Sequence, residues 1–247
     1  AQNSFQKIIA IGGDGTVHEI ANGILQSQKN ITLGLIPVGT GNDLAAAYKI
    51  GYDIKKNIEL IVSDKIFYQD VIEIKSPNLK TDQYVISMMG FGFDADVAGN
   101  VNGYKQKGSS GKLVYILSAV KTIFKYEPVE VKIIHDEKET SYKILTMAAG
   151  IHRTNGGGII QCPDAMPDDG FMNVTLIAPL NLWDVITILP KLFSGKIYNH
   201  KKVKHFISKQ ITISGIGVSA EADGEEVCQL PVTLQVLPKA LKVLSNR

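Results

Sequence analysis

The sequence has few of the features that mark disulfide-rich, membrane-spanning or nucleic-acid-binding proteins. Two cysteines, Cys162 and Cys228, stand among 247 residues, which is too few for a disulfide framework and indicates a reducing compartment. No apolar run approaches the ~18–20 residues of a membrane-spanning helix, and no signal-peptide pattern opens the sequence. The net charge of +2 is too small to attract nucleic acid by bulk electrostatics. We therefore expect a cytoplasmic protein without a nucleic-acid partner, whose membrane contact, if any, is peripheral.

Histidine also offers little chemistry. The five histidines show no metal-ligand spacing with one another or with cysteine, and no Ser-His-Asp or Cys-His nucleophile is favoured. A hydrolase is therefore not supported, and His18 is expected to be a surface or packed histidine rather than a catalytic one. The remaining composition, with 45% hydrophobic and 20% charged residues, is typical of a globular protein with one large or two modest domains.

The most informative pattern is a short apolar run that ends in glycines. Residues 8–11 have the length of a buried strand, and they are followed by Gly12, Gly13, Asp14, Gly15 and Thr16 and then by helix-compatible sequence. Such a turn brings backbone N–H groups and a helix N-terminus together, which suits a phosphate. Asp14 would repel a phosphate, so we interpret its carboxylate as a group for Mg²⁺, for a ribose hydroxyl or for fixing the loop. A tight turn with no ligand is the alternative.

A second glycine turn follows the next predicted strand. Residues 33–37 read as another buried strand, and after it come Gly39, Thr40, Gly41, Asn42 and Asp43. A helix is expected to begin near Leu44, capped by Asp43 or Asn42. Because the two strands form one βαβ unit, both turns lie at strand carboxyl ends and face one crevice. Neither turn has the spacing of a Walker A or of a GxGxxG motif, so nucleotide phosphates would be bound by another route.

These two motifs, GGDGT and GTGNDLA, resemble the catalytic domain of diacylglycerol kinases, sphingosine kinases and their bacterial lipid-kinase relatives. Further motifs in the family's order extend the resemblance over essentially the whole chain, at residues 90–97, 156–159, 163–165, 168–170 and 223–225. GGDGT alone is less specific, because NAD kinases and phosphofructokinases carry similar loops. The resemblance implies ATP as phosphoryl donor, Mg²⁺ as cofactor and a lipid hydroxyl as acceptor, most simply that of diacylglycerol.

One departure from the family pattern concerns the start of the sequence. The family opens with a strand ending in an Asn-Pro-x-x-Gly turn and further βα segments, whereas this sequence begins a few residues before the GGDGT strand. We expect residues 1–247 alone to lack kinase activity and to be less stable than a parent protein that carries these elements. An inactive or regulatory module is the non-enzymatic alternative, and a small-molecule kinase similar to NAD kinases is the second enzymatic one.

The periodicity predicts an α/β nucleotide-binding half followed by an antiparallel, β-sandwich-like half. The first domain covers residues 1–70, lacks the family's N-terminal elements and regains residues 240–247 at the end, and the second covers 71–239. Two helices interrupt the β-rich half, over 112–126 and over 182–194, the latter with Asn181 as cap and Gly195 as its end. Strands are expected at 71–74, 83–89, 129–134, 143–149, 172–177, 210–213 and 233–237.

The candidate catalytic residues come late in the sequence. Asp223 and Glu225 flank a glycine and, on sequence alone, read as an ordinary hairpin turn. The resemblance implies that Asp223 is the general base for the lipid hydroxyl and that Glu225 assists it near the metal. It also implies a structural Mg²⁺ site at Asp168 and Asp169, shared through water with the two carboxylates of the glycine loops.

Three further sites are weaker. The resemblance places Asp70 and Lys112 near the nucleotide or the active site, although either residue could simply be solvated. The run over 196–209 carries five lysines directly after the apolar helix 182–194, which would suit an anionic membrane surface. A helix packed in the core beside a solvated lysine face is the alternative, and homo-oligomer formation stays open.

Overall fold

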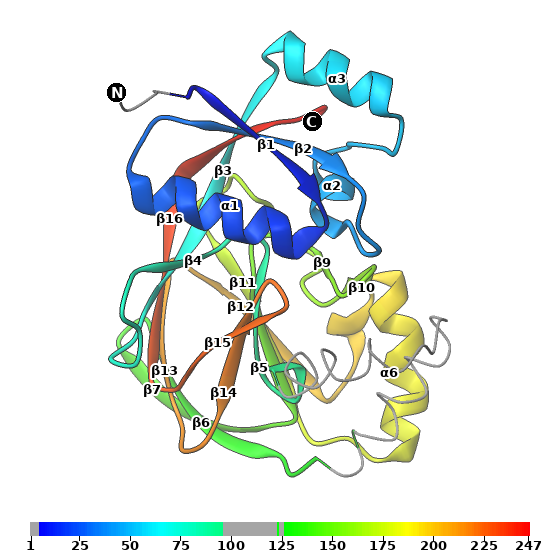
Figure 1. Ribbon diagram of the computed structural model, residues 1–247. Coiled ribbons are helices and arrows are strands. Elements are labelled where there is room, and N and C mark those ends of the chain that lie inside the picture. The colour runs from blue at the N-terminus through cyan, green and yellow to red at the C-terminus, as the bar shows by residue number, and fades with distance from the viewer. Residues whose placement is uncertain (1–4, 96–122, 124–125) are drawn as a thin grey trace, which may run out of the picture.

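The computed structural model describes residues 5–95, 123 and 126–247, which form an α/β region above a β-sandwich (Figure 1). The predicted α/β half followed by an antiparallel sandwich is confirmed. Lys112 and most of the predicted helix over 112–126 lie outside the described residues.

The α/β region is a parallel βαβ unit with two short helices. It contains β1 (Lys7–Gly12), α1 (Asp14–Ser27), β2 (Thr32–Pro37), α2 (Asp43–Ala47) and α3 (Ile54–Ser63). β1 and β2 pair in parallel from Lys7↔Thr32 to Gly12↔Pro37, so both glycine loops leave the same edge of the sheet, as predicted. α1 packs on this sheet through Val17, Ala21 and Ile24, which recur at helical spacing and are buried.

Two long strands run through both halves of the molecule. β3 (Ile66–Lys75) pairs with β16 (Val232–Leu244) in an antiparallel ladder that is interrupted by a bulge between Leu237 and Leu241. Beyond the bulge, β16 pairs in parallel with β2, while its first residues pair with β13 (Gln210–Ser214) in the sandwich. The predicted boundary near residue 70 therefore falls inside a strand, with no linker between the halves.

The sandwich consists of two sheets with an apolar core between them. Its first layer is the lower part of an eight-stranded sheet and adds β4 (Gln83–Val85), β6 (Val129–His135) and β7 (Lys138–Ile144) to the strands above. The second layer is antiparallel, in the order β12 (Val203–Ser208), β11 (Met172–Ile177), β8 (Thr146–Gly150), β5 (Met88–Gly92), β14 (Ser219–Ala222) and β15 (Glu225–Gln229). The core includes Phe91, Met147 and Leu234, which are fully buried.

Two predicted strands are each divided by a crossing between the sheets. Residues 83–89 form β4 in the first layer and the start of β5 in the second, and residues 143–149 divide at Leu145 between β7 and β8. Continuous apolar sequence hides such crossings, because both layers bury apolar side chains. The sequence pattern did not indicate β12, β14, β15 or the short strands at 154–155 and 159–160, and it covered only the last two residues of β7.

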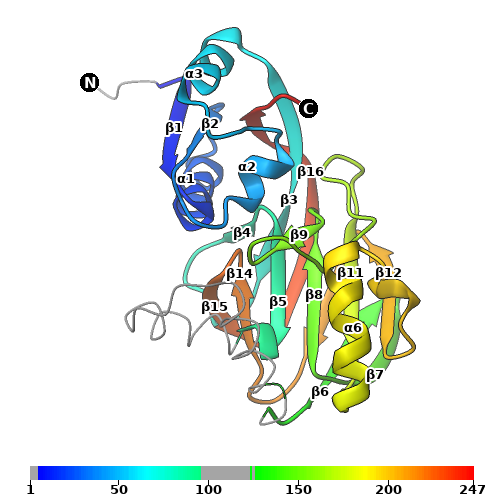
Figure 2. The same ribbon diagram turned by 90° about the vertical axis from the view of Figure 1, so that its right-hand side faces the viewer.

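The second layer is covered on its outer side by a hairpin and a helix (Figure 2). The hairpin is β9 (Thr154–Asn155) with β10 (Ile159–Ile160), and the helix is α6 (Leu182–Ser194), followed by the 3₁₀ turn η2 (Ile197–Asn199). The predicted bounds of α6 are confirmed: Asn181 and Asp184 form a capping box, and Gly195 ends the helix with φ of 69°.

Candidate active site

The two glycine loops touch through their backbones. A methyl group on Gly39 would lie only 2.5 Å from the Cα atom of Gly13, and one on Gly13 would lie 3.2 Å from the Cα atom of Gly39. The Val38 N–H donates to the Gly12 carbonyl at 3.1 Å, which holds the loops together. Only glycine permits this approach, and it leaves a surface of backbone atoms at the N-terminus of α1.

Asp14 fixes this pair of loops. Its carboxylate accepts the N–H groups of Asp43 at 3.2 Å and of Leu44 at 3.0 Å, and so caps α2 from the other loop. The capping side chain is therefore that of Asp14 and not the predicted Asn42 or Asp43. Asn42 occupies the position before α2, but its side chain accepts from the Gly39 N–H and donates to the Gly39 carbonyl. The loop-fixing interpretation of Asp14 agrees with these contacts.

The same loops bring two carboxylates close to one glycine. A methyl group on Gly41 would lie 2.9 Å from Asp14 Oδ2 and 4.0 Å from Asp43 Oδ2, so both carboxylates face one glycine. No group of three His, Cys, Asp or Glu side chains suited to a metal occurs among the described residues. Two carboxylates fit Mg²⁺ that arrives with phosphates, since this ion is commonly held by one or two carboxylates, waters and substrate oxygens.

Asp70, Asp168 and Asp169 belong to the junction of the two halves. Asp70 is fully buried and accepts from the N–H of Gly170 at 2.7 Å and of Lys239 at 2.8 Å, so it fastens the turn at 168–170 to the bulge in β16. Burial, with the charges of Asp70 and Asp168, raises the pKa of Asp169. The contacts of Asp70 are structural, and those of Asp169 are with its own turn, at the Phe171 N–H.

Asp223 stands in the turn between β14 and β15, yet its carboxylate points inward. Its side chain is 1% exposed. One oxygen accepts from the N–H groups of Ser87 at 2.8 Å and Met88 at 3.0 Å, and the other lies 2.9 Å from the Ile86 nitrogen and 2.7 Å from His18 Nδ1. Residues 86–88 are the crossing between the sheets, where backbone N–H groups need partners outside the ladders. Four nitrogens therefore surround the carboxylate, and they fill its capacity of about four accepted hydrogen bonds.

Glu225, two residues later, lies in the opposite environment. It is exposed, and a methyl group on Gly15 would lie 3.5 Å from Glu225 Oε1. The β14–β15 hairpin thus presents one carboxylate to the glycine loop of the other half and buries its neighbour.

His18 has a structural role that the sequence pattern did not indicate. It is a packed histidine, as expected, but it joins α1 to the hairpin through Asp223. Burial lowers the pKa of His18, but the hydrogen bond and charge of Asp223, with the charge of Glu225, outweigh burial and raise it. The sequence feature that could have indicated a place near the site is the position of His18 four residues after Asp14, on the same face of the helix.

Two more carboxyl groups lie buried behind the hairpin. Burial raises the pKa of Glu221 to about 8, although its carboxyl accepts the Gly224 N–H at 2.6 Å. Burial also raises the pKa of Asp94, which accepts from the Gln161 amide at 2.7 Å. Both residues lie next to Gly90, so two acidic side chains are buried on the inner side of the hairpin.

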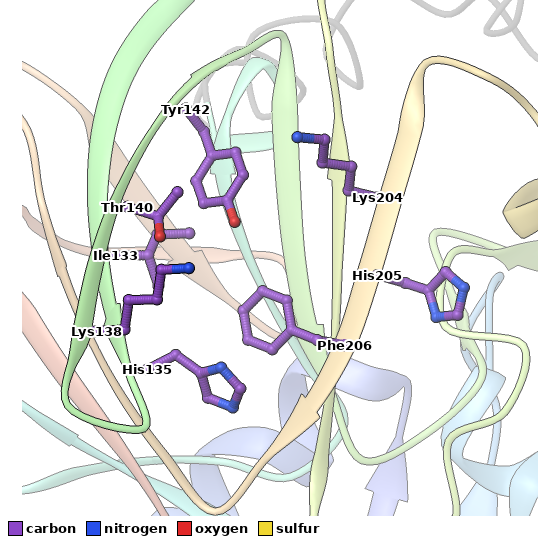
Figure 3. Close-up of a pocket in the computed structure, with 8 residues that line it drawn as sticks. All are labelled: Ile133, His135, Lys138, Thr140, Tyr142, Lys204, His205 and Phe206. Carbon is purple, nitrogen blue, oxygen red and sulfur yellow. The ribbon is translucent and has the colours of Figure 1, made fainter.

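A separate groove opens between the edges of the two sheets. It has a volume of about 520 Å³ and lies between the β6–β7 hairpin and β12, which stand at the ends of their strand orders. Figure 3 shows the Lys138 amine and the Tyr142 hydroxyl pointing toward the Phe206 ring. None of the glycine-loop residues or of residues 223–225 lines this groove.

Comparison with known families divides the chain into the same two parts. Residues 1–74 match the family described as diacylglycerol kinase catalytic domain, and residues 87–245 match the YegS C-terminal NAD kinase beta sandwich-like domain. The chain belongs to the diacylglycerol kinase catalytic-domain family. The resemblance found in its motifs is thereby confirmed.

Relatives of this diacylglycerol kinase-family chain carry kinase names. It is 30% identical over 241 residues to the Staphylococcus haemolyticus protein named "Putative lipid kinase SH2167", covering 96% of this chain and 76% of the relative. It is 27% identical over 247 residues to a protein of Staphylococcus carnosus named diacylglycerol kinase, covering all of this chain and 78% of that relative.

Solved structures show the same fold. A crystal structure of a diacylglycerol kinase from Bacillus anthracis superposes with a TM-score of 0.69 at 20% identity, over 98% of this chain and 76% of that one. In the described part of the chain, every helix is too short or too polar to cross a membrane.

Proposed function

We propose that this protein transfers the γ-phosphoryl group of ATP to a lipid hydroxyl, with diacylglycerol as the acceptor and phosphatidic acid as the product. The observation that carries the proposal is the approach of Glu225 to Gly15, which brings an exposed carboxylate beside a loop built for phosphate. The family and the names of the relatives support the same chemistry.

In this proposal the nucleotide is bound mainly by backbone. The loops at Gly12–Thr16 and Gly39–Asn42 offer N–H groups and the N-terminus of α1 to the phosphates. Asp14 and Asp43 would hold Mg²⁺ together with those phosphates, and the ion would neutralise charge on the transferred group. Asp168 and Asp169 remain a proposed structural Mg²⁺ site at the junction.

The two hairpin carboxylates take unequal roles. In this role Glu225 accepts the proton of the lipid hydroxyl while the hydroxyl oxygen bonds to the γ-phosphorus. The bond from the γ-phosphorus to the bridging oxygen of the β-phosphate breaks, and ADP leaves. Asp223, to which the resemblance assigns the role of general base, is better suited to positioning, since its acceptor positions are filled by His18 and three backbone N–H groups. It would fix the hairpin against α1 and so aim Glu225.

The test is a substrate panel with labelled ATP and Mg²⁺. The protein in its full encoded length is offered diacylglycerol, a sphingoid base, a polyprenol and NAD. We expect label in phosphatidic acid, and label in NADP alone would show instead a small-molecule kinase, the alternative suggested by the NAD kinase-like sandwich. An arm with residues 1–247 alone tests the expectation that this segment is inactive by itself. Label in none of the acceptors at full length would contradict the proposal.

A further inference from the structure

Helix α6 carries apolar side chains on two opposite faces. Its inner face packs through Val185 and Ile188, each 2% exposed, and Ile188 joins a cluster with Ile177, Ile197 and Val203. Its outer face exposes Leu182 (57%), Trp183 (75%), Ile186 (51%) and Phe193 (46%). At about 100° per residue, these four side chains fall within one arc of about 100°. We call them the α6 stripe.

The sequence that contains and follows the α6 stripe is rich in lysine and poor in acids. Residues 181–204 contain five lysines and one acid, Asp184, which is buried in the capping box. Lys201 is 79% exposed, and Lys196 and Lys204 are also exposed. α3 offers a contrast, since it exposes Ile54, Ile58 and Val62 too, but residues 53–65 contain three lysines and three acids.

α6 is also linked to the second glycine loop through the β9–β10 hairpin. Its end at Gly195 contacts Ile160 of β10, where a methyl group on the glycine would lie 3.6 Å from the isoleucine side chain. The tip of this β9–β10 hairpin reaches the second glycine loop, because the Gly157 N–H donates to Asp43 at 2.6 Å. Figure 2 shows α6 and the hairpin on one face of the molecule, below the glycine loops.

We propose that α6 docks this protein on an anionic phospholipid bilayer, with the α6 stripe inserted among the headgroups and the lysines at lipid phosphates. The inference rests on the proposed function, because a kinase for a membrane-embedded lipid has to reach its substrate there. Exposed Trp beside Leu, Ile and Phe is the composition of interfacial helices, and nearby lysines add attraction to anionic lipids. A second copy of the chain is a poorer occupant, since a twofold contact would bring two net positive surfaces together.

Trp183 is the only tryptophan in the sequence, so intrinsic fluorescence reports on this helix. The protein of residues 1–247, in which Trp183 is the single tryptophan, is titrated without ATP or diacylglycerol, with phosphatidylglycerol vesicles and with phosphatidylcholine vesicles. We expect a blue shift, and quenching by brominated acyl chains, with the anionic vesicles only. Cosedimentation without any change in Trp183 emission would mean that another surface binds and would overturn the proposal. A blue shift that grows with protein concentration in the absence of vesicles would also overturn the proposal, because it would indicate self-association through α6.

Variants distinguish vesicle binding through the α6 stripe from nonspecific adsorption of exposed apolar side chains. Leu182→Ser with Ile186→Ser is expected to weaken anionic-vesicle binding at least tenfold, and Lys196→Gln with Lys201→Gln by about fivefold per lysine. The matched control is Ile58→Ser with Val62→Ser on α3, whose side chains are 51% and 74% exposed and should leave binding unchanged. Equal losses in the control would overturn the assignment. Unchanged melting temperatures establish that the α6 variants fold.

A kinase assay on short-chain diacylglycerol, dispersed as monomers, separates this inference from the proposed function. The α6 variants should phosphorylate the dispersed substrate at the wild-type rate and lose activity only on vesicles. Loss on both substrates would assign α6 to the active site instead of to docking. If vesicles bind as expected while no diacylglycerol is phosphorylated in either form, the proposed function fails and the docking surface stands.

Discussion

The two halves of the molecule present different chemical groups where Glu225 approaches Gly15. The α/β side presents backbone, with two glycine loops in contact and the half-buried Asp14 bracing one loop against the other. The sandwich side presents side chains, with Asp223 and Glu221 buried and Glu225 exposed at the tip of a hairpin. Backbone N–H groups hold a fixed partial charge, whereas the protonation of a carboxyl depends on its burial. Substitutions should therefore act on nucleotide affinity on one side and on rate, stability and pH response on the other.

The largest effect is expected at the exposed carboxylate. Glu225→Gln should lower kcat by about 10²–10⁴-fold, the usual contribution of a general base, with little change in ATP KM. The free energy of unfolding should stay near wild type because the side chain is exposed. Glu226→Gln, one residue on and also exposed, is the matched control. A Glu225→Gln enzyme that retains most of its kcat would remove this residue from catalysis.

The next largest effect is expected at Asp223, the buried carboxylate two residues before Glu225. Asp223→Asn should lower the free energy of unfolding by about 3–5 kcal/mol, because its amide cannot accept from all three N–H groups and no longer balances His18. Urea denaturation measures the change, with Glu225→Gln as the control of similar chemistry. If Asp223→Asn keeps wild-type stability and loses only kcat, Asp223 acts on the substrate directly, as the family resemblance implies.

On the backbone side, the contact between the loops should control nucleotide affinity. Gly39→Ala would push its methyl group to 2.5 Å from Gly13 and force the loops apart. We expect the ATP KM to rise by about tenfold to 100-fold, since misplacement near 1 Å has effects of that order. Gly23→Ala in α1, where a methyl group meets nothing within 4 Å, is the control. Unchanged nucleotide affinity in folded Gly39→Ala would move the phosphate site elsewhere.

The smallest effect, for a change of one pH unit, is a pH dependence of stability from Glu221. Its pKa is raised to about 8 in the folded protein from 4.5, so between these values the folded state holds a proton that the unfolded state releases. Its contribution to stability is complete below pH 4.5 and declines as the pH rises toward 8, by at most about 1.4 kcal/mol per unit. Glu221→Gln should remove this decline and be more stable than wild type at pH 8. Parallel stability curves for the two proteins would contradict the assignment.

The features that the sequence predicted are those with local signals. The glycine loops, the βαβ unit and the capped α6 each depend on residues within one or two turns of one another. The division of 83–89 between two sheets and the inward carboxylate of Asp223 do not. Asp223 meets His18 across 205 positions, and its other partners are N–H groups exposed by a sheet crossing that continuous apolar sequence conceals. A pattern could indicate the turn at 223–225, but only the fold could show which of its two carboxylates faces solvent.

The position of β16 has a consequence for how the chain is made. β2, with the buried Leu33 and Leu35, pairs with residues of β16 that come about 200 positions later, such as Lys242 opposite Thr32. At about 5–20 residues per second, a ribosome needs roughly 10–40 s to cover that distance. During this interval one edge of β2 is without its final neighbour, and the nascent chain exposes an apolar strand to chaperones or to other nascent chains. The sheet that carries both glycine loops therefore gains β16 only after about 200 further residues have been synthesised.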